Sequence, residues 1–199
     1  DGSLSDDARL RALSCLEKFG ERLREYPSRS VRIVGTKTLR SIADSSQFLE
    51  EAQQRLGHPV EIISGDEEAR LIYIGAAHEV PAVQGNRLVV DIGGGSTEVL
   101  WMRRAGERFE TVAWTSLAAG VVTISERFGG GVDVTPESFE AMREHLRPML
   151  REFAERVSVA NGGTPPVPSH LLGTSGTVTT IAGVQLGLAR YDRARVDGC

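Results

Sequence analysis

Three consecutive glycines, Gly93 to Gly95, interrupt an otherwise apolar stretch and restrict how it can fold. RLVVDI precedes them and TEVLWMR follows, and both runs have the β-branched and aliphatic composition of strands. ERFETVAWTS is a third run of this kind, beginning at residue 107. Glycine weakens a strand interior and marks a turn. The stretch therefore predicts three successive strands joined by tight turns, a meander rather than crossovers.

Elsewhere, short apolar runs alternate with segments of helical period. Residues 30–36 predict a buried strand and residues 60–65 a second strand, each followed by a helix, and this order favours βαβ units in an α/β fold. Ser5 predicts the N-cap of a first helix, and Thr135 with Pro136 predicts the start of a long one. The first helix carries Cys15 on an apolar stripe with five other residues, Leu10, Leu13, Leu16, Phe19 and Leu23.

Charge and composition exclude several function classes. The formal net charge of -4 disfavours nucleic acid and anionic membranes as partners, so we expect neither. No apolar run approaches the roughly 20 residues of a membrane helix, and we expect a cytoplasmic protein. The two cysteines, Cys15 and Cys199, are too few for a disulfide framework or a zinc site.

The segment DIGGGST, residues 91–97, has the composition of an anion site. Glycines at a sharp turn let several backbone N–H groups face a bound phosphate closely. Ser96 and Thr97 can donate to the same phosphate, and Asp91 can supply a hard oxygen ligand to Mg²⁺. The alternative is an ordinary glycine-rich hairpin with a solvated acid.

A second strand-to-turn segment strengthens this interpretation. In LLGTSGTVTT, a strand leads into Gly173, Thr174, Ser175 and Gly176, and then into a helix whose N-terminus favours an anion. Two such turns in one small chain point to phosphate chemistry. The alternative is two unrelated turns capped by hydroxyls.

Two charged segments supply candidate chemistry. In SGDEEARL, Ser64 and Glu67 have the spacing of a capping box, which leaves Glu68 able to accept a proton from an attacking water. In GTKTLRS, Lys37 and Arg40 follow a strand, and the planar guanidinium of arginine suits phosphate. The alternatives are an acid favoured only by the helix dipole and lone surface cations.

Taken in order, GTKTLR, ISGDEEARL, DIGGGSTE and GTSGTVTT resemble the exopolyphosphatase and guanosine pentaphosphate phosphohydrolase (Ppx/GppA) family over essentially all 199 residues. The resemblance implies the actin-like ATPase superfamily, with an RNase H-like core in two lobes. Residues 1–84 would end the first lobe and residues 85–199 would begin the second, with a linker at 78–87. The family releases terminal phosphates from inorganic polyphosphate or pppGpp, using a divalent cation such as Mg²⁺ in the interlobe cleft.

Matched by motif, Glu68 corresponds to the catalytic glutamate of the family, and Asp91 and Glu98 to its metal-associated acids. Arg40 corresponds to a phosphate-contacting arginine. The resemblance further implies phosphate contacts at Gly93, Gly94, Gly95, Ser96 and Thr97, and at Gly173, Thr174, Ser175 and Gly176.

The resemblance also implies what this chain lacks. Family members carry an earlier phosphate loop before the first helix and continue past VDGC, so both lobes are expected to be incomplete in this central fragment. We expect the fragment alone to hydrolyse little or no phosphate. A bacterial protein of the stringent response, paired as a homodimer, is also implied. An ATP-dependent kinase of the same superfamily and a non-catalytic sensor of (p)ppGpp or polyphosphate are the alternatives, and the sequence does not choose between polyphosphate and pppGpp.

Overall fold

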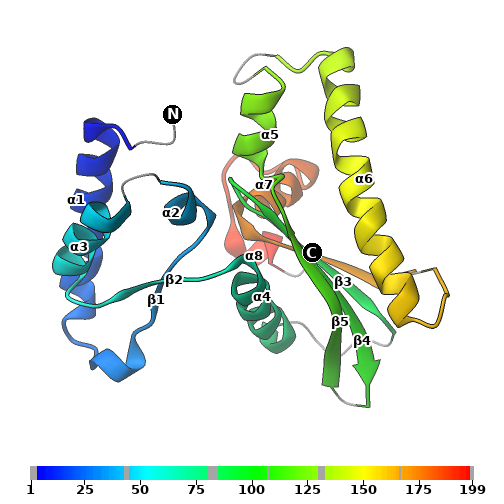
Figure 1. Ribbon diagram of the computed structural model, residues 1–199, viewed down its shortest axis with the longest axis horizontal. Helices are drawn as coiled ribbons and strands as arrows, with labels where there is room; N and C mark the ends of the chain where they lie inside the picture. Colours follow the sequence, from blue (N-terminus) through cyan, green and yellow to red (C-terminus); the bar gives the residue numbers. More distant parts are fainter. Residues whose placement is uncertain are drawn as a thin grey trace. The chain divides into compact units, whose positions relative to one another are not determined.

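The computed structural model describes residues 4–42, 45–79, 85–106, 108–129, 133–165 and 167–197. The chain divides into two compact units, Asp1–Ser64 and Gly65–Cys199. Figure 1 shows the helices and strands of both units.

The first unit is a small α/β unit around a parallel strand pair. Strands β1 and β2 are parallel, with Ile33 opposite Val60 at one end of the pair and Gly35 opposite Ile62 at the other. This pairing confirms the predicted βαβ connection. Its elements in chain order are α1 Asp6–Leu23, η1 Ser28–Ser30, β1 Ile33–Gly35, α2 Lys37–Ser41, α3 Ser45–Leu56 and β2 Val60–Ile62.

Helices α1 and α3 form the apolar core of this unit around Leu13, Phe48 and Ala52. Ser5 caps α1 as predicted, because its Oγ accepts the Ala8 N–H at 3.3 Å. Gly20 allows a close crossing, since a Cβ there would lie 2.1 Å from the Arg55 carbonyl oxygen.

The predicted apolar stripe of α1 is partly wrong. Leu10 is 67% exposed and Phe19 53% exposed, and Cys15 is exposed as well. The close crossing at Gly20 turns the face through Leu13 toward α3, which leaves the other side of the predicted stripe in solvent. Cys199 lies outside the described residues.

The second unit is built on a four-stranded sheet in the order β5-β4-β3-β6. Strands β3, β4 and β5 are antiparallel neighbours, which confirms the predicted meander, and β6 is parallel to β3. The elements are α4 Gly65–Glu79, β3 Arg87–Ile92, β4 Thr97–Ala105, β5 Arg108–Leu117, α5 Val121–Arg127, α6 Pro136–Ala160, β6 His170–Thr174, α7 Ser175–Gln185 and α8 Arg193–Val196.

Helices cover both faces of this sheet (Figure 1). Helix α6, capped by Thr135 and started by Pro136 as predicted, buries Phe153 and Val157 on one face. Helix α4 buries Ala69 on the opposite face, against Val89, Leu100 and Met102. Full burial of a Val or Phe side chain contributes about 1.5–3 kcal/mol, so Phe153 and Val157 contribute substantially to holding α6 on the sheet.

Helix α4 groups with the sheet rather than with the residues before it. The chain divides into its two units between Ser64 and Gly65, whereas the lobe boundary expected from the sequence falls between residues 84 and 85. The reason is the apolar face of α4, where Ala69 is fully buried. Residues 80–84 of the expected linker lie outside the described residues. Across the described helices, none is both long and apolar enough to traverse a bilayer.

Candidate active site

The triple-glycine segment forms the turn between β3 and β4. Ile92 and Thr97 are the last paired residues, and the Gly93 N–H closes the turn on the Ser96 carbonyl at 3.0 Å. None of the three glycines has a positive φ, so left-handed backbone does not explain them. The turn is a hairpin, as the meander requires.

Helix α5 approaches the glycine turn closely. The Val121 and Val122 N–H groups donate to the Gly93 and Gly94 carbonyls at 3.0 and 2.9 Å. A Cβ on Gly120 would lie 2.2 Å from the Gly94 oxygen, so only glycine fits. The N-terminus of α5 therefore binds the carbonyl side of the turn.

The backbone N–H groups of the turn differ from its carbonyls. Within the described part of the chain, the N–H groups of Gly94, Gly95 and Ser96 have no protein acceptor. Gly94 is exposed and Ser96 is buried. The turn thus has backbone donors without acceptors among the described residues, as an anion site needs.

A polar row crosses the sheet beside this turn. Register places Asp91 opposite Thr174 on one side and opposite Glu98 on the other, and Glu98 opposite Ser116. Thr174 Oγ1 donates to Asp91 Oδ2 at 2.5 Å, and Ser116 Oγ donates to Glu98 Oε1 at 2.7 Å. We call these four residues, Thr174, Asp91, Glu98 and Ser116, the acid row.

The two carboxylates of the acid row are direct cross-strand neighbours, whose Cβ atoms typically lie about 4.5–5.5 Å apart. Asp91 is half-buried, and Glu98 is only 2% exposed. Like charges directly opposite each other are destabilising, so this pair favours a cation nearby.

Helix α4 brings Glu68 to the same face of the sheet. Gly65, Glu68, Ala69 and Ile72 have the i, i+3, i+4, i+7 spacing of one helical stripe. Gly65 lies against Ser116, and Ala69 and Ile72 pack on the Val89–Leu100 cluster. Glu68 is half-buried on this stripe, and the face it meets is the one that carries Asp91 and Glu98.

Glu67, the neighbouring acid, points to a different partner. Its carboxylate accepts from Arg70 Nε at 2.6 Å and from Arg70 Nη2 at 2.8 Å. This paired carboxylate raises the pKa of Arg70. The predicted capping box between Ser64 and Glu67 stays a prediction. The two adjacent acids thus differ in role, with only Glu68 on the sheet-facing stripe.

The second predicted loop meets the first at the end of the sheet. Ser175 begins α7 with φ 75°, a left-handed backbone conformation that is uncommon for serine. Its Oγ donates to the Ile92 carbonyl at 2.7 Å, and Thr174 donates to Asp91. Both loops therefore border Asp91.

Several hydroxyls predicted to contact phosphate are already donating within the protein. Thr97 Oγ1 donates to the Ala119 carbonyl at 2.8 Å, and Ser175 and Thr174 donate to β3. A hydroxyl has one proton to donate. Donation by Thr97, Thr174 or Ser175 to a phosphate would require these bonds to break, so the glycine-turn amides are the better donors.

The acid row fits Mg²⁺ by its donor chemistry. Mg²⁺ is usually held through one or two carboxylates together with waters and phosphate oxygens, and Asp91 with Glu98 provides two. Among the residues whose placement is described, no three or more His, Cys, Asp or Glu side chains gather as a metal-binding group. A cation here would therefore depend on substrate oxygens as well.

Arg40 lies in the first unit, half-buried on α2. Its Nη1 donates to the Ile63 carbonyl, just after β2. The predicted phosphate contact of Arg40 stays a prediction.

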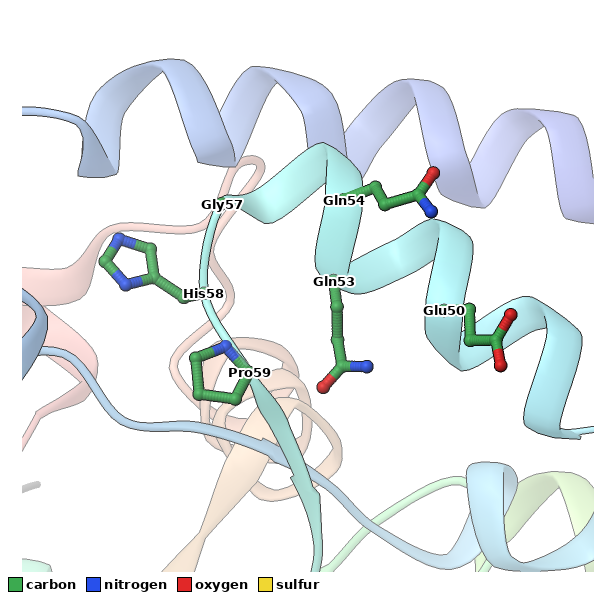
Figure 2. A pocket seen from close by; sticks show the side chains of 6 residues that line it. All are labelled: Glu50, Gln53, Gln54, Gly57, His58 and Pro59. Atoms are coloured by element: carbon green, nitrogen blue, oxygen red, sulfur yellow. The ribbon is translucent and has the colours of Figure 1, made fainter.

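Two open pockets lie apart from the predicted residues. One of about 510 Å³ is lined in the first unit by Glu50, Gln53, Gln54, Gly57, His58 and Pro59. Figure 2 shows the ends of Glu50 and Gln54 pointing away from the His58 ring. A second of about 640 Å³ lies around the loop from Gly187 to Arg195. Neither is lined by a predicted site residue.

Sequence reasoning missed Ser116, Gly65 and Gly120. The meander predicts that Glu98 has a cross-strand partner on the third strand, but its spacing does not identify Ser116 as that partner. Gly65 and Gly120 had no sequence signal, because only the packing of α4 and α5 reveals their close approaches.

Comparison with known proteins places the chain among phosphatases. Residues 1–192 match the Ppx/GppA phosphatase family. A guanosine-5'-triphosphate,3'-diphosphate pyrophosphatase of Vibrio cholerae is 44% identical over 169 residues, which cover 81% of this chain and 33% of that protein. A protein of the same name from Vibrio vulnificus is 41% identical over 184 residues, which cover 92% of this chain and 35% of that protein. The chain thus spans about a third of these curated relatives.

Solved structures show the same similarity. The Ppx/GppA family member of Aquifex aeolicus superposes with a TM-score of 0.72 at 26% identity, covering 100% of this chain and 60% of that one. An exopolyphosphatase from Cytophaga hutchinsonii superposes with a TM-score of 0.79 at 25% identity, and the match covers 98% of this chain and 60% of that one. These neighbours confirm the predicted α/β fold of the actin-like ATPase type.

Proposed function

Because this chain belongs to the Ppx/GppA phosphatase family, we propose that the protein containing it is a phosphohydrolase that removes the terminal phosphate of pppGpp. The observation that carries the proposal is the acid row beside the glycine turn, with Glu68 on the same sheet face. Opposed carboxylates and unused amide donors suit a bound phosphate and a cation together.

Each group has a role in the proposed reaction. The amides of Gly94, Gly95 and Ser96 bind oxygens of the terminal phosphate. Glu68 takes a proton from a water molecule while the oxygen of that water forms a bond to the terminal phosphorus. The bond between this phosphorus and the bridging oxygen breaks on the opposite side, in line with the attack. The nucleoside polyphosphate leaves, and inorganic phosphate is the other product.

Asp91 and Glu98 would hold the cation that the reaction needs. When bound, Mg²⁺ supplies charge neutralisation at the transferring phosphate. Thr174 and Ser116 fix one oxygen of each carboxylate through their hydroxyl groups. The remaining carboxylate oxygens are then oriented for ligation.

Polyphosphate is the second candidate substrate. The Vibrio relatives are named for guanosine-5'-triphosphate,3'-diphosphate, which favours pppGpp, while the Cytophaga neighbour is an exopolyphosphatase. Both substrates present a terminal phosphate to the same chemistry. Residues that select between them are not among those of the acid row, because a terminal phosphate is common to both.

Phosphate release by the full-length protein tests the proposal. pppGpp, polyphosphate and ATP are supplied separately, with and without Mg²⁺, and inorganic phosphate is measured. We expect Mg²⁺-dependent release from pppGpp, polyphosphate or both. Phosphoryl transfer from ATP to an acceptor would favour a kinase, and tight binding without turnover would favour a sensor.

Further expectations follow for this chain and its parent. We propose that residues 1–199 alone release little phosphate, because they span only about a third of the curated relatives. A homodimer, a cytoplasmic location and a place in a bacterial stringent response stay predictions, as do the absence of nucleic-acid and membrane partners.

A further inference from the structure

The first turn of α4 is fastened to strand β5 at two points. Trp114 Nε1 donates to Asp66 Oδ1 at 3.2 Å. Asp66 precedes Glu68 by two residues in the same turn. Trp114 is 42% exposed, so burial of apolar surface is only part of its use there.

Ser116 provides the second point. A Cβ on Gly65 would lie 2.7 Å from Ser116 Cβ and 3.0 Å from its Oγ, so the helix start rests directly on this side chain. The same Oγ donates to the buried carboxylate of Glu98 at 2.7 Å. Ser116 therefore contacts both the start of α4 and the acid row.

Strand β5 is itself anchored from the opposite face. Arg156 of α6 donates to the Trp114 carbonyl, and Ala113 is buried in the cluster around Phe153 and Val157. Trp114 is thus fixed through its backbone on one side, while its indole reaches α4 on the other. A residue held in this way can restrict the rotation and slide of the helix it touches.

We propose that Trp114 and Ser116 are positioning residues that set the placement of the first turn of α4, and through it the orientation of Glu68 toward the acid row. This rests on the proposed function only in taking Glu68 as the base. A small displacement of a catalytic base lowers the rate of the chemical step more than the affinity for substrate, because alignment matters most in the transition state.

The Trp114–Asp66 hydrogen bond gives the sharper test. In the full-length protein, Trp114→Phe keeps an aromatic ring but removes the N–H, and Asp66→Ala removes the acceptor. Asp66→Asn is the conservative control, because its amide oxygen still accepts from the indole. The double variant, Trp114→Phe with Asp66→Ala, completes a cycle.

For the more active substrate, we expect Trp114→Phe and Asp66→Ala each to lower kcat by roughly three- to tenfold. KM and the urea midpoint should change little, Asp66→Asn should resemble the wild type, and the double variant should be no slower than either single variant. Equal kcat in all variants would overturn the proposal, and so would an Asp66→Asn defect as large as that of Asp66→Ala.

Amide hydrogen exchange separates this proposal from the function it rests on. The amides of residues 69–72, whose helical hydrogen bonds go to the first-turn carbonyls, should exchange faster in Trp114→Phe and Asp66→Ala than in the wild type and Asp66→Asn. This readout needs no turnover, so it decides the positioning role even if the protein releases no phosphate. Unchanged exchange in Trp114→Phe would show that the indole does not hold the turn.

Discussion

Asp91 on β3 and Glu98 on β4 are register partners, so two acids face the same side of the sheet directly opposite each other. A hydroxyl flanks each, Thr174 beside Asp91 and Ser116 beside Glu98. An arrangement of four paired polar side chains across four strands is costly for a core and useful for ligation.

Replacing Asp91 with asparagine should weaken the response to Mg²⁺. The change removes one of two opposed carboxylates while keeping an acceptor for the Thr174 hydroxyl. In the full-length protein we expect the Mg²⁺ concentration for half-maximal phosphate release to rise roughly tenfold or more. A Mg²⁺ titration of activity measures this.

Asp133→Asn is the matched control, because Asp133 is exposed on a loop and should leave the titration unchanged. An Asp91→Asn titration that overlays the wild-type curve would remove Asp91 from the metal assignment.

Replacing Ser116 with alanine should destabilise the protein by about 1–3 kcal/mol, because the buried Glu98 carboxylate loses a hydrogen-bond donor. Urea unfolding followed by circular dichroism measures the free energy of unfolding. Ser169→Ala, at an exposed position just before β6 in the same unit, should stay within about 0.5 kcal/mol of the wild type. Equal stability of the two variants would contradict the stated role of the Ser116 hydroxyl.

Replacing Gly120 with alanine should displace α5 from the glycine turn. The new Cβ would meet the Gly94 carbonyl at 2.2 to 2.3 Å and the Gly95 nitrogen at 2.5 Å, and backbone atoms cannot move aside easily. Overpacking of this kind costs about 1–3 kcal/mol or more. We expect a lower urea midpoint together with weaker substrate binding.

Gly183→Ala is the control for that loss. Gly183 lies inside α7 with open space where the methyl group of alanine would lie, so alanine should stabilise the helix by about 0.5–1 kcal/mol. A Gly120→Ala protein as stable as Gly183→Ala would show that α5 does not need the close approach.

The local pattern of the sequence was sufficient for most elements. The triple glycine between two β-branched runs predicted the β3–β4 hairpin, and Ser5 and Thr135 marked helix starts that the structure confirms. Such features depend on neighbours along the chain, which the sequence shows directly.

Features that depend on packing were harder to predict. Counting back from the β4–β5 turn, where Ala105 pairs with Arg108, would place Thr115 opposite Glu98. The irregularity between Trp101 and Met102 shifts the register by one, which brings Ser116 there instead. A shift of one residue exchanges the two faces of a strand, so the hydroxyl partner of Glu98 could not be identified from spacing alone.

The central claim is that Glu68 is the base of a phosphohydrolase, and Glu68→Gln tests it most directly. Phosphate release by the full-length protein is measured with saturating substrate and Mg²⁺. Glu67→Gln is the control, since Glu67 lies on the same turn but pairs with Arg70. We predict that Glu68→Gln loses roughly 10²-fold or more in kcat while Glu67→Gln stays close to the wild type. A Glu68→Gln enzyme as fast as the Glu67→Gln control would contradict the account.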